Sequence, residues 1–165
     1  MKFIVDCMCG KLAKWLKILG FDTLYFSKID DKELLFLAEK EDRILLSRDN
    51  LLIKKSRNLS SLFIESENWN EQLEQVLGEF NLWDEVKPNS RCLECNVELK
   101  NLSRKQVWNL VTPFVYKHGK LFALCPICGR VYWKGSHSKD MEFRIGEILN
   151  KQKEIKHPKS GENKN

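Results

Sequence analysis

Four cysteines in the second half of the chain form two Cys-x-x-Cys pairs. Cys92 pairs with Cys95 and Cys125 with Cys128, and 29 residues separate the two pairs. Each pair is expected to form a tight turn that directs two thiolates to one point, so that two turns complete a tetrahedral zinc site. Gly129, directly after the second pair, suits a left-handed turn. Two disulfides or free buried cysteines are the alternatives, and the paired spacing favours zinc.

Three aspartate positions form a second candidate site. Asp6 and Asp49 each follow an apolar run, and Asp30 and Asp31 begin a predicted helix. If the runs are parallel strands, these acids lie at one edge of a sheet, where functional groups of such folds gather. Converging carboxylates repel one another unless a cation lies among them, and carboxylate oxygens suit Mg²⁺ or Mn²⁺. Such ions cleave phosphodiesters by activating water. Asp31 could instead cap a helix, and Asp49 could be a cap or turn residue.

Basic residues near these acids could hold a nucleic-acid backbone. Lys11, Lys14 and Lys17 recur at a spacing of three on a predicted helix, which keeps them near one face. A solvated helix face explains the same spacing and is the preferred interpretation for Lys17. Arg48, beside Asp49, could bind a phosphate or neutralise the neighbouring acids.

Alternating hydrophobic periods predict the elements that position these residues. Short β-rich runs predict four strands, at residues 2–5, 22–26, 43–47 and 62–64. Helical spacing predicts a helix after each strand, the last at about residues 70–80. Regular alternation of strand and helix implies right-handed crossovers and a parallel sheet covered on both faces. The predicted fold class is therefore α/β, with a small β-rich zinc ribbon after the sheet.

The chain divides into three predicted parts. Residues 1–83 form the α/β domain, and residues 83–90, which contain Pro88, are predicted to be a linker. Residues 84–149 form the zinc-ribbon module, with strands predicted at 112–116, 120–124 and 131–133 and a hairpin turn between the first two. Residues 150–165 contain almost nothing apolar and are predicted to be a disordered basic tail.

Composition sets broad limits on the class of protein. Of the 165 residues, 42% are hydrophobic and 31% are charged, and no apolar run approaches a membrane span. The acid at position 6 interrupts the first apolar run at once, so we expect no signal peptide and a cytoplasmic location. The formal net charge of +5 is uneven: residues 1–83 carry −2, residues 84–149 carry +4, and the remainder carries +3. This asymmetry suits a polyanionic partner, although a ribbon and tail that are basic without such a partner would give the same numbers.

Five motifs in a fixed order resemble a known family. They are DCMCGKLAKWLKILGFD at 6–22, DDKELL at 30–35, RILLSRD at 43–49, SRCLECN at 90–96 and CPICGRVYWKGSH at 125–137. Together they resemble the PIN-like ribonuclease domain called the Mut-seven C-terminal domain, over about residues 2–149. The resemblance implies a PIN-like α/β nuclease fold with an attached zinc ribbon and a metal-dependent RNase activity.

The resemblance also assigns roles by position. It implies that Asp6, Asp31 and Asp49 hold the divalent metal and that the four paired cysteines bind zinc. Asp22 matches a Gly-x-Asp element with a structural role. His137 matches a Trp-x-Gly-Ser-His element and either contacts substrate or is a hydrogen-bonded structural histidine.

The chain departs from the family pattern at three points, one of which is Cys9, in place of a usually aliphatic residue before Gly10. Ser47 stands where the family usually has threonine before Arg-Asp. PIN-type nucleases often present a fourth acid, and Glu65, after the fourth predicted strand, matches it by position only.

The sequence therefore predicts a metal-dependent ribonuclease. Asp6, Asp31 and Asp49 are the predicted catalytic acids, with Mg²⁺ or Mn²⁺ as cofactor and a separate structural Zn²⁺. The predicted substrate contacts are Lys11, Lys14, Arg48 and His137. RNA is the expected partner, and association with a ribonucleoprotein or ribosome is left open. Alternatives are a catalytically inactive PIN-like module that binds RNA or a ribonucleoprotein and, with less support, a protein-binding adaptor.

Three aromatic residues of the ribbon have two possible uses. Trp108, Tyr132 and Trp133 could stack on bases, but packing in the core is the preferred interpretation.

Overall fold

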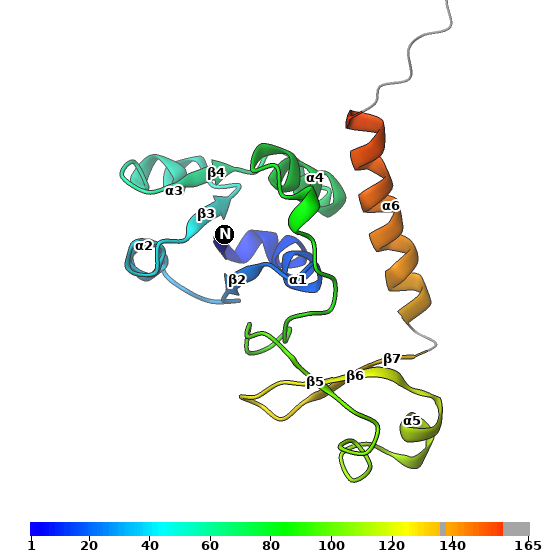
Figure 1. Ribbon diagram of the computed structural model, residues 1–165. Helices are drawn as coiled ribbons and strands as arrows, with labels where there is room; N and C mark the ends of the chain where they lie inside the picture. Colours follow the sequence, from blue (N-terminus) through cyan, green and yellow to red (C-terminus); the bar gives the residue numbers. More distant parts are fainter. Residues whose placement is uncertain (136–137, 157–165) are drawn as a thin grey trace, which may run out of the picture.

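The first part of the chain is a four-stranded parallel sheet. A computed structural model describes residues 1–135 and 138–156. The sheet has the order β2-β1-β3-β4 (Figure 1). Its strands are β1 (Lys2–Val5), β2 (Asp22–Tyr25), β3 (Ile44–Ser47) and β4 (Ser61–Phe63). The predicted strands and their parallel direction are thus confirmed, with boundaries that differ by at most one residue.

Helices cover both faces of this sheet. They are α1 (Gly10–Ile18), which the short 3₁₀ helix η1 (Cys7–Cys9) precedes, α2 (Asp31–Lys40), α3 (Asn50–Lys55) and α4 (Trp69–Glu79). Because side chains alternate along a strand, Phe3 and Val5 pack with α1 and α4, whereas Ile4 packs with α2 and α3. Each face therefore has its own hydrophobic core.

The second sheet is antiparallel and has three strands. These are β5 (Lys100–Leu102), β6 (Lys120–Leu124) and β7 (Val131–Lys134), in the order β5-β6-β7. The strand predicted at residues 112–116 is wrong, because α5 (Pro113–His118) occupies this segment. Thr112 caps the helix by accepting from the Val115 N–H, and Pro113 in the first turn needs no backbone partner. The fold class, a parallel sheet with helices followed by a small β-rich module, is confirmed.

The C-terminal helix α6 (Ser138–Lys156) continues past the predicted end of the ribbon module. The disorder predicted from residue 150 is wrong for residues 150–156, which are helical, and residues 157–165 lie outside the described residues. Apolar residues at helical spacing explain the helix: Ile145 and Ile148 are buried in the core that α1 and α4 form, and Met141 and Leu149 pack against it. Figure 1 shows α6 beside α4.

The segment predicted to be a linker is packed against α1. It contains the 3₁₀ helix η2 (Trp83–Glu85), and Trp83 is buried. The N–H of Lys87 donates to the Leu19 carbonyl at 2.8 Å. Gly20 has a φ of +97°, and a Cβ at this position would lie 2.5 Å from the Lys87 carbonyl oxygen. Residues 83–90 are therefore a fixed part of the fold.

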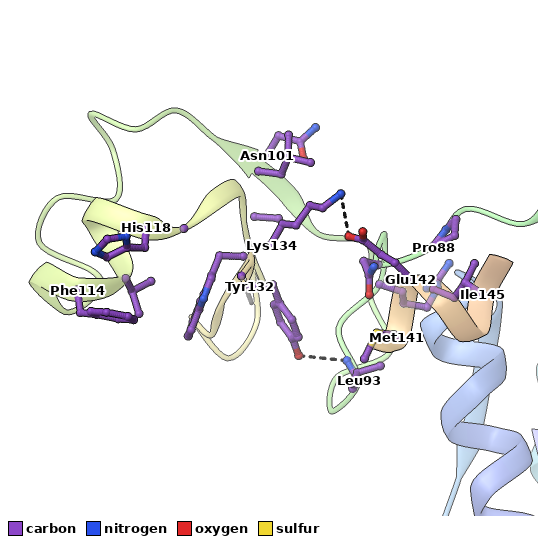
Figure 2. A pocket seen from close by; sticks show the side chains of 18 residues that line it. Pro88, Leu93, Asn101, Phe114, His118, Tyr132, Lys134, Met141, Glu142 and Ile145 are labelled. Atoms are coloured by element: carbon purple, nitrogen blue, oxygen red, sulfur yellow. Dashed lines mark hydrogen bonds and ion pairs between the residues drawn. The ribbon is translucent and has the colours of Figure 1, made fainter. Parts of the chain in front are cut away.

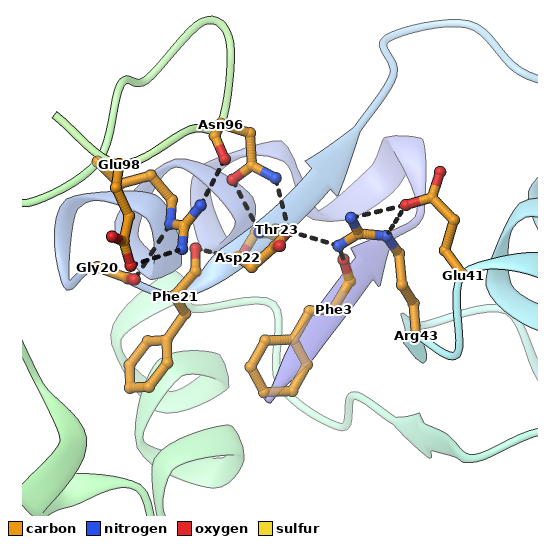
Figure 3. A network of polar contacts seen from close by, with 10 residues as sticks. Phe3, Gly20, Phe21, Asp22, Thr23, Glu41, Arg43, Asn96 and Glu98 are labelled. Atoms are coloured by element: carbon orange, nitrogen blue, oxygen red, sulfur yellow. Dashed lines mark hydrogen bonds and ion pairs between the residues drawn. The ribbon is translucent and has the colours of Figure 1, made fainter. Parts of the chain in front are cut away.

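A polar network joins the first cysteine turn to the edge of the parallel sheet (Figure 3). Asn96 accepts from the Thr23 N–H at 2.9 Å and donates to the Asp22 carboxylate at 2.7 Å. Arg43 donates to the same carboxylate oxygen at 2.6 Å and to the Phe3 carbonyl at 3.2 Å. Asp22 thus connects three segments that are far apart in the sequence.

Two further basic side chains join the same parts of the molecule. Lys17 is only 9% exposed, and its Nζ donates to the Leu93 carbonyl at 3.0 Å. The solvated position expected for Lys17 is therefore wrong, and burial lowers the pKa of this amine. Arg91 donates to the carbonyls of Gly20 and Asn96 at 3.2 and 2.5 Å. The cysteine turn is held to α1 and β2 by contacts at several independent points.

We expect Asp22→Asn to destabilise the protein in a pH-dependent manner. Burial acts to raise the pKa of Asp22, but hydrogen bonds from Arg43 and Asn96 outweigh it and lower this pKa. A depressed carboxyl pKa stabilises the fold above the unfolded value of about 4, and this contribution is lost as the pH falls through the folded pKa. Denaturant unfolding at about pH 7 should show a loss of about 2 kcal/mol, and the loss should shrink toward about pH 3.

Glu41→Gln is the matched control for this substitution. Glu41 pairs with the same arginine at 2.8 Å but has a more exposed carboxylate. Its replacement should therefore cost less than about 1 kcal/mol. An equal loss for Asp22→Asn at both pH values would contradict the proposed charge contribution.

Candidate functional site

The four cysteines form a compact cluster. Their Sγ atoms all lie within 4.8 Å of one another. A tetrahedral zinc site with Zn–S bonds of 2.3 Å has S–S edges of about 3.8 Å. The Sγ atoms of Cys92 and Cys128 are 3.8 Å apart. The cluster could therefore hold Zn²⁺.

The two cysteine turns have the same backbone design. In each turn the N–H of the second cysteine points to the Sγ of the first, at 3.4 Å in Cys92–Cys95 and 3.5 Å in Cys125–Cys128. The residue after each pair donates its N–H to the carbonyl of the first cysteine at 3.0 Å. That residue is Asn96 or Gly129, with φ of +57° or +69°. The left-handed turn predicted at Gly129 is confirmed, and Asn tolerates the same conformation in the first turn.

Tyr132 on β7 supports the cluster from outside. Its hydroxyl lies 3.2 Å from Cys92 Sγ and 3.2 Å from the Leu93 N. Burial and the contact with Cys92 raise the pKa of Tyr132 to about 12, so the hydroxyl keeps its proton. Burial acts to raise the pKa of Cys92, but the hydrogen bonds from Tyr132 and from the turn's N–H groups lower it to about 6. The thiolate is thus favoured at Cys92, whereas burial and hydrogen bonds with the other three cysteines raise the pKa of Cys95 to about 12, so that a metal would have to displace the proton of Cys95.

The predicted acids follow the carboxyl ends of three adjacent strands. Asp6 comes directly after β1 and is only 8% exposed, and its Oδ2 accepts from the Ser47 hydroxyl at 2.8 Å. The same Ser47 oxygen accepts from the Asp49 N–H at 2.9 Å. Asp49 caps α3, because its Oδ1 accepts from the N–H groups of Leu51 and Leu52. The Ser47 hydroxyl therefore contacts both the Asp6 carboxylate and the Asp49 backbone N–H.

Asp31 has a different partner from Asp6 and Asp49. Asp30 is the cap of α2, and it accepts from the N–H groups of Lys32 and Glu33. Asp31 instead forms a 2.7 Å ion pair with Lys55, the last residue of α3. This contact raises the pKa of Lys55. In the described part of the chain, the cysteine cluster is the one group of three or more His, Cys, Asp or Glu residues with ligand atoms within 4.8 Å of one another. The three carboxylates do not converge that closely.

The basic residues predicted to contact substrate are in different environments. Lys11 and Lys14 lie on α1 and are exposed to solvent. Arg48 donates to Glu67 at 2.8 Å, and its Nε is buried without a hydrogen-bond partner, the one such side-chain N or O atom among the described residues. His137 lies outside the described residues. Glu65 follows β4 at the same edge of the sheet and is exposed.

Sequence reasoning did not identify three residues near the acids as parts of the site. Ser47, Lys55 and Glu67 each contact a predicted site residue. Ser47 was visible only as a departure from a family pattern. Lys55 and Glu67 gave no signal, because charged residues at a helix end and in a loop are common. Their partners are defined only when the helices pack on the sheet.

The acids and the cysteines lie toward opposite ends of the parallel strands. Asp22, which binds the cysteine turn through Asn96, is the first residue of β2, whereas Asp6 and Asp49 follow the last residues of β1 and β3. A four-residue strand spans about 10 Å from its first to its last Cα. Any metal held by the cysteines is thus remote from the acids.

An apolar groove of about 1140 Å³ lies between the ribbon and α6 (Figure 2). Leu93, Tyr132 and Met141 are among the residues that line it. Across its rim Lys134 forms a 2.8 Å ion pair with Glu142. None of the three predicted catalytic acids contributes to this groove.

Comparison with known proteins places the chain in a family. A family model described as the Mut7-C RNAse domain matches residues 1–145. The chain belongs to the Mut7-C RNase domain family. The resemblance inferred from the five motifs is thus confirmed. The Mut7-C match covers the predicted acids, the four cysteines and the start of α6, and its name implies RNA as the substrate class. Comparison with curated proteins found no match, and comparison with solved structures found none either.

No helix in the described part of the chain combines the length and apolar character needed to cross a membrane.

We expect Cys125→Ser to abolish stoichiometric zinc binding. Cys125 is fully buried in the cluster, and loss of one thiolate opens a site that four thiolates would close. Metal analysis of the purified variant should show little zinc, and the ribbon should lose thermal stability because zinc binding is coupled to folding. Cys7→Ser is the control, since Cys7 is an exposed free thiol outside the cluster. Equal zinc contents in the two variants would exclude the cluster as the zinc site.

Proposed function

We propose that this protein is a metal-dependent ribonuclease that hydrolyses RNA phosphodiesters. Asp6 and Asp49 would hold Mg²⁺ or Mn²⁺, and Asp31 would position a further ligand or water. The observation that carries the proposal is the buried Asp6 carboxylate, which lies beside Asp49 at the carboxyl end of the sheet of a Mut7-C domain. A carboxylate that ends an apolar strand is costly to bury unless it binds something.

The donor set fits a magnesium-type ion. Mg²⁺ commonly uses one or two carboxylates and keeps several waters, so a third close carboxylate is not required. Ser47 orients Asp6 through Oδ2, and both N–H contacts of Asp49 use Oδ1. Oδ2 of Asp49 is therefore a suitable ligand atom, and the Asp6 carboxylate, which also accepts from the Cys7 thiol, would supply the second. When bound, such an ion would activate a water and stabilise the leaving oxygen.

Arg48 supports the assignment of the substrate. Its buried Nε is a hydrogen-bond donor without a partner in the sequence Ser47-Arg48-Asp49. A buried donor without a partner costs free energy, and a phosphate oxygen or an ordered water would satisfy it. Lys11 and Lys14 are exposed on α1, which follows Asp6 and η1, and would contact the RNA backbone. His137 is kept as a proposed substrate contact on the family motif alone.

The zinc site has a separate role in this proposal. Four thiolates would close the coordination sphere and leave no position for a reactive water. Zn²⁺ would therefore stabilise the ribbon, and the ribbon would contribute to RNA binding.

A specific observation favours the second candidate, a catalytically inactive RNA-binding module. The three carboxylates do not converge within 4.8 Å, and Asp31 is neutralised by Lys55. A protein that had lost the reaction but kept the scaffold could have this arrangement. The two candidates predict different results for Asp6→Asn: a nuclease loses RNA cleavage, whereas an inactive binding module has no cleavage to lose.

We expect Asp6→Asn to reduce divalent-dependent RNA cleavage by roughly 100-fold or more while the fold is retained. The amide has the shape of the carboxylate and can still accept from Ser47, but it loses the charge that binds the cation. The measurement is cleavage of structured and single-stranded RNA with Mg²⁺, Mn²⁺ or EDTA, with circular dichroism to check the fold.

Asp42→Asn is the matched control for this experiment. Asp42 is exposed and has a φ of +51°, a conformation that asparagine tolerates, and it is not among the proposed site residues. Its replacement should leave cleavage unchanged. Cleavage by Asp6→Asn at the rate of the unmodified protein would refute the nuclease assignment and leave the binding module.

Lys55→Ala should lower the concentration of Mn²⁺ that gives half-maximal cleavage. The Lys55 ammonium lies 2.7 Å from an Asp31 oxygen, so it competes with a cation for the same carboxylate. The control is Lys54→Ala, which removes the neighbouring exposed ammonium from the same helix turn. An equal shift for both variants would indicate a general charge effect rather than competition at Asp31.

A further inference from the structure

The segment between β5 and β6 exposes large apolar side chains. This segment, residues 103–119, is called the β5–β6 insertion. Within it Val107 is fully buried, whereas Trp108 is 64% exposed, and Leu110 and Phe114 are also exposed. Trp108 is therefore not used for core packing. Neighbouring exposed apolar side chains of this size are typical of binding surfaces.

A hollow in this insertion is built around two aromatic rings. It has a volume of about 550 Å³ and is lined by Arg104, Trp108, Asn109 and Tyr116, among others. The rings of Trp108 and Tyr116 meet edge to face with centroids 4.9 Å apart. The Arg104 guanidinium lies 5.0 Å from the centroid of the Tyr116 ring and donates to the carbonyls of Tyr116 and Lys117. Arg104 and Tyr116 thus hold each other, and the indole beside them remains accessible.

The stretch of chain that carries the hollow has charged residues of one sign. Residues 99–139 contain no aspartate or glutamate. The same stretch contains basic residues at positions 100, 104, 105, 117, 120, 130, 134 and 139. The groove of Figure 2 differs, because there Glu142 pairs with Lys134. The residues that line the hollow include two cations, Arg104 and Lys117, and no acid.

We propose that the β5–β6 insertion is a binding site for single-stranded RNA. A base would stack on the exposed indole of Trp108, and Lys117 would contact the adjacent phosphate. The Asn109 amide would offer a donor and an acceptor to the edge of the base. A single strand fits both features, because unpaired bases present flat apolar faces while the backbone supplies negative charge. RNA is named as the ligand because of the proposed function, but stacking of a base on Trp108 does not require that the protein cleaves RNA.

The test measures RNA binding without cleavage. The full chain carrying Asp6→Asn, with its zinc and without added Mg²⁺ or Mn²⁺, is titrated into a fluorescein-labelled oligouridine of about 12 nucleotides. Adding Trp108→Ala should raise the Kd by roughly 5- to 100-fold, the range expected for loss of one base–aromatic stack. Lys117→Ala should reduce the slope of log K against log salt by about 0.7.

Phe36→Ala is the matched control for Trp108→Ala. Phe36 on α2 is 58% exposed and has Lys40 Nζ 5.6 Å from its ring centroid, so it also pairs an exposed ring with a cation, remote in sequence from the insertion. Its replacement should not change the Kd. Circular dichroism and zinc content confirm that each variant is folded.

The outcomes separate this proposal from the nuclease assignment. An unchanged Kd for Trp108→Ala overturns the stacking site, as does equally tight binding of duplex RNA that depends equally on Trp108. Loss of binding in Trp108→Ala supports the site even if the unmodified protein cleaves no RNA. Absence of cleavage would refute only the nuclease proposal.

Discussion

The polar network around Asn96 and Asp22 is the interaction that most directly joins the first cysteine turn to the parallel sheet. The Asn96 side chain accepts from the Thr23 N–H on the edge strand β2 and donates to Asp22 Oδ1. Asp22 in turn binds Arg43, which contacts β1 through the Phe3 carbonyl. Buried polar groups are stable only when all of them have partners. The ribbon and the parallel sheet therefore complete each other's hydrogen bonds, and residues 83–96 pack against α1 and β2 rather than forming a flexible connection.

This arrangement separates two kinds of chemistry within one small protein. The cysteines offer sulfur ligand atoms beside the amino ends of the strands, and the acids of the proposed site offer carboxylate oxygens beyond the carboxyl ends. Soft thiolates select zinc, whereas carboxylates suit harder ions such as magnesium and manganese. The proposed magnesium or manganese site and the cysteine cluster would therefore not compete for the same ion. The neighbouring cysteines Cys7 and Cys9 do not alter this division: the hydrogen bond to Asp6 raises the pKa of Cys7, and burial raises that of Cys9 to about 11, so both remain thiols.

Much of the fold was predictable from local patterns, and the failures have physical causes. The strands of the parallel sheet are short apolar runs followed by turns, so their positions were found to within one residue. The segment at 112–116 is rich in β-formers, but the Thr112-Pro113 helix start outweighed that propensity. Helix α6 depends on a surface of the first domain that the sequence of residues 138–156 does not reveal. At the candidate site, the order of the acids was predictable, whereas the contact between Asp31 and Lys55 depends on how two helices meet.

The same asparagine that caps the sheet edge also closes the first cysteine turn. Its N–H binds the Cys92 carbonyl, as the Gly129 N–H binds that of Cys125, so its backbone belongs to the metal turn and its side chain to the sheet. A glycine would suit the turn equally well but would leave the Thr23 amide without its partner. Metal binding at the cysteine cluster should therefore be thermodynamically linked to hydrogen exchange at the Thr23 amide of the parallel sheet. Protection of that amide would then report, from within the parallel sheet, whether the cysteine cluster holds an ion.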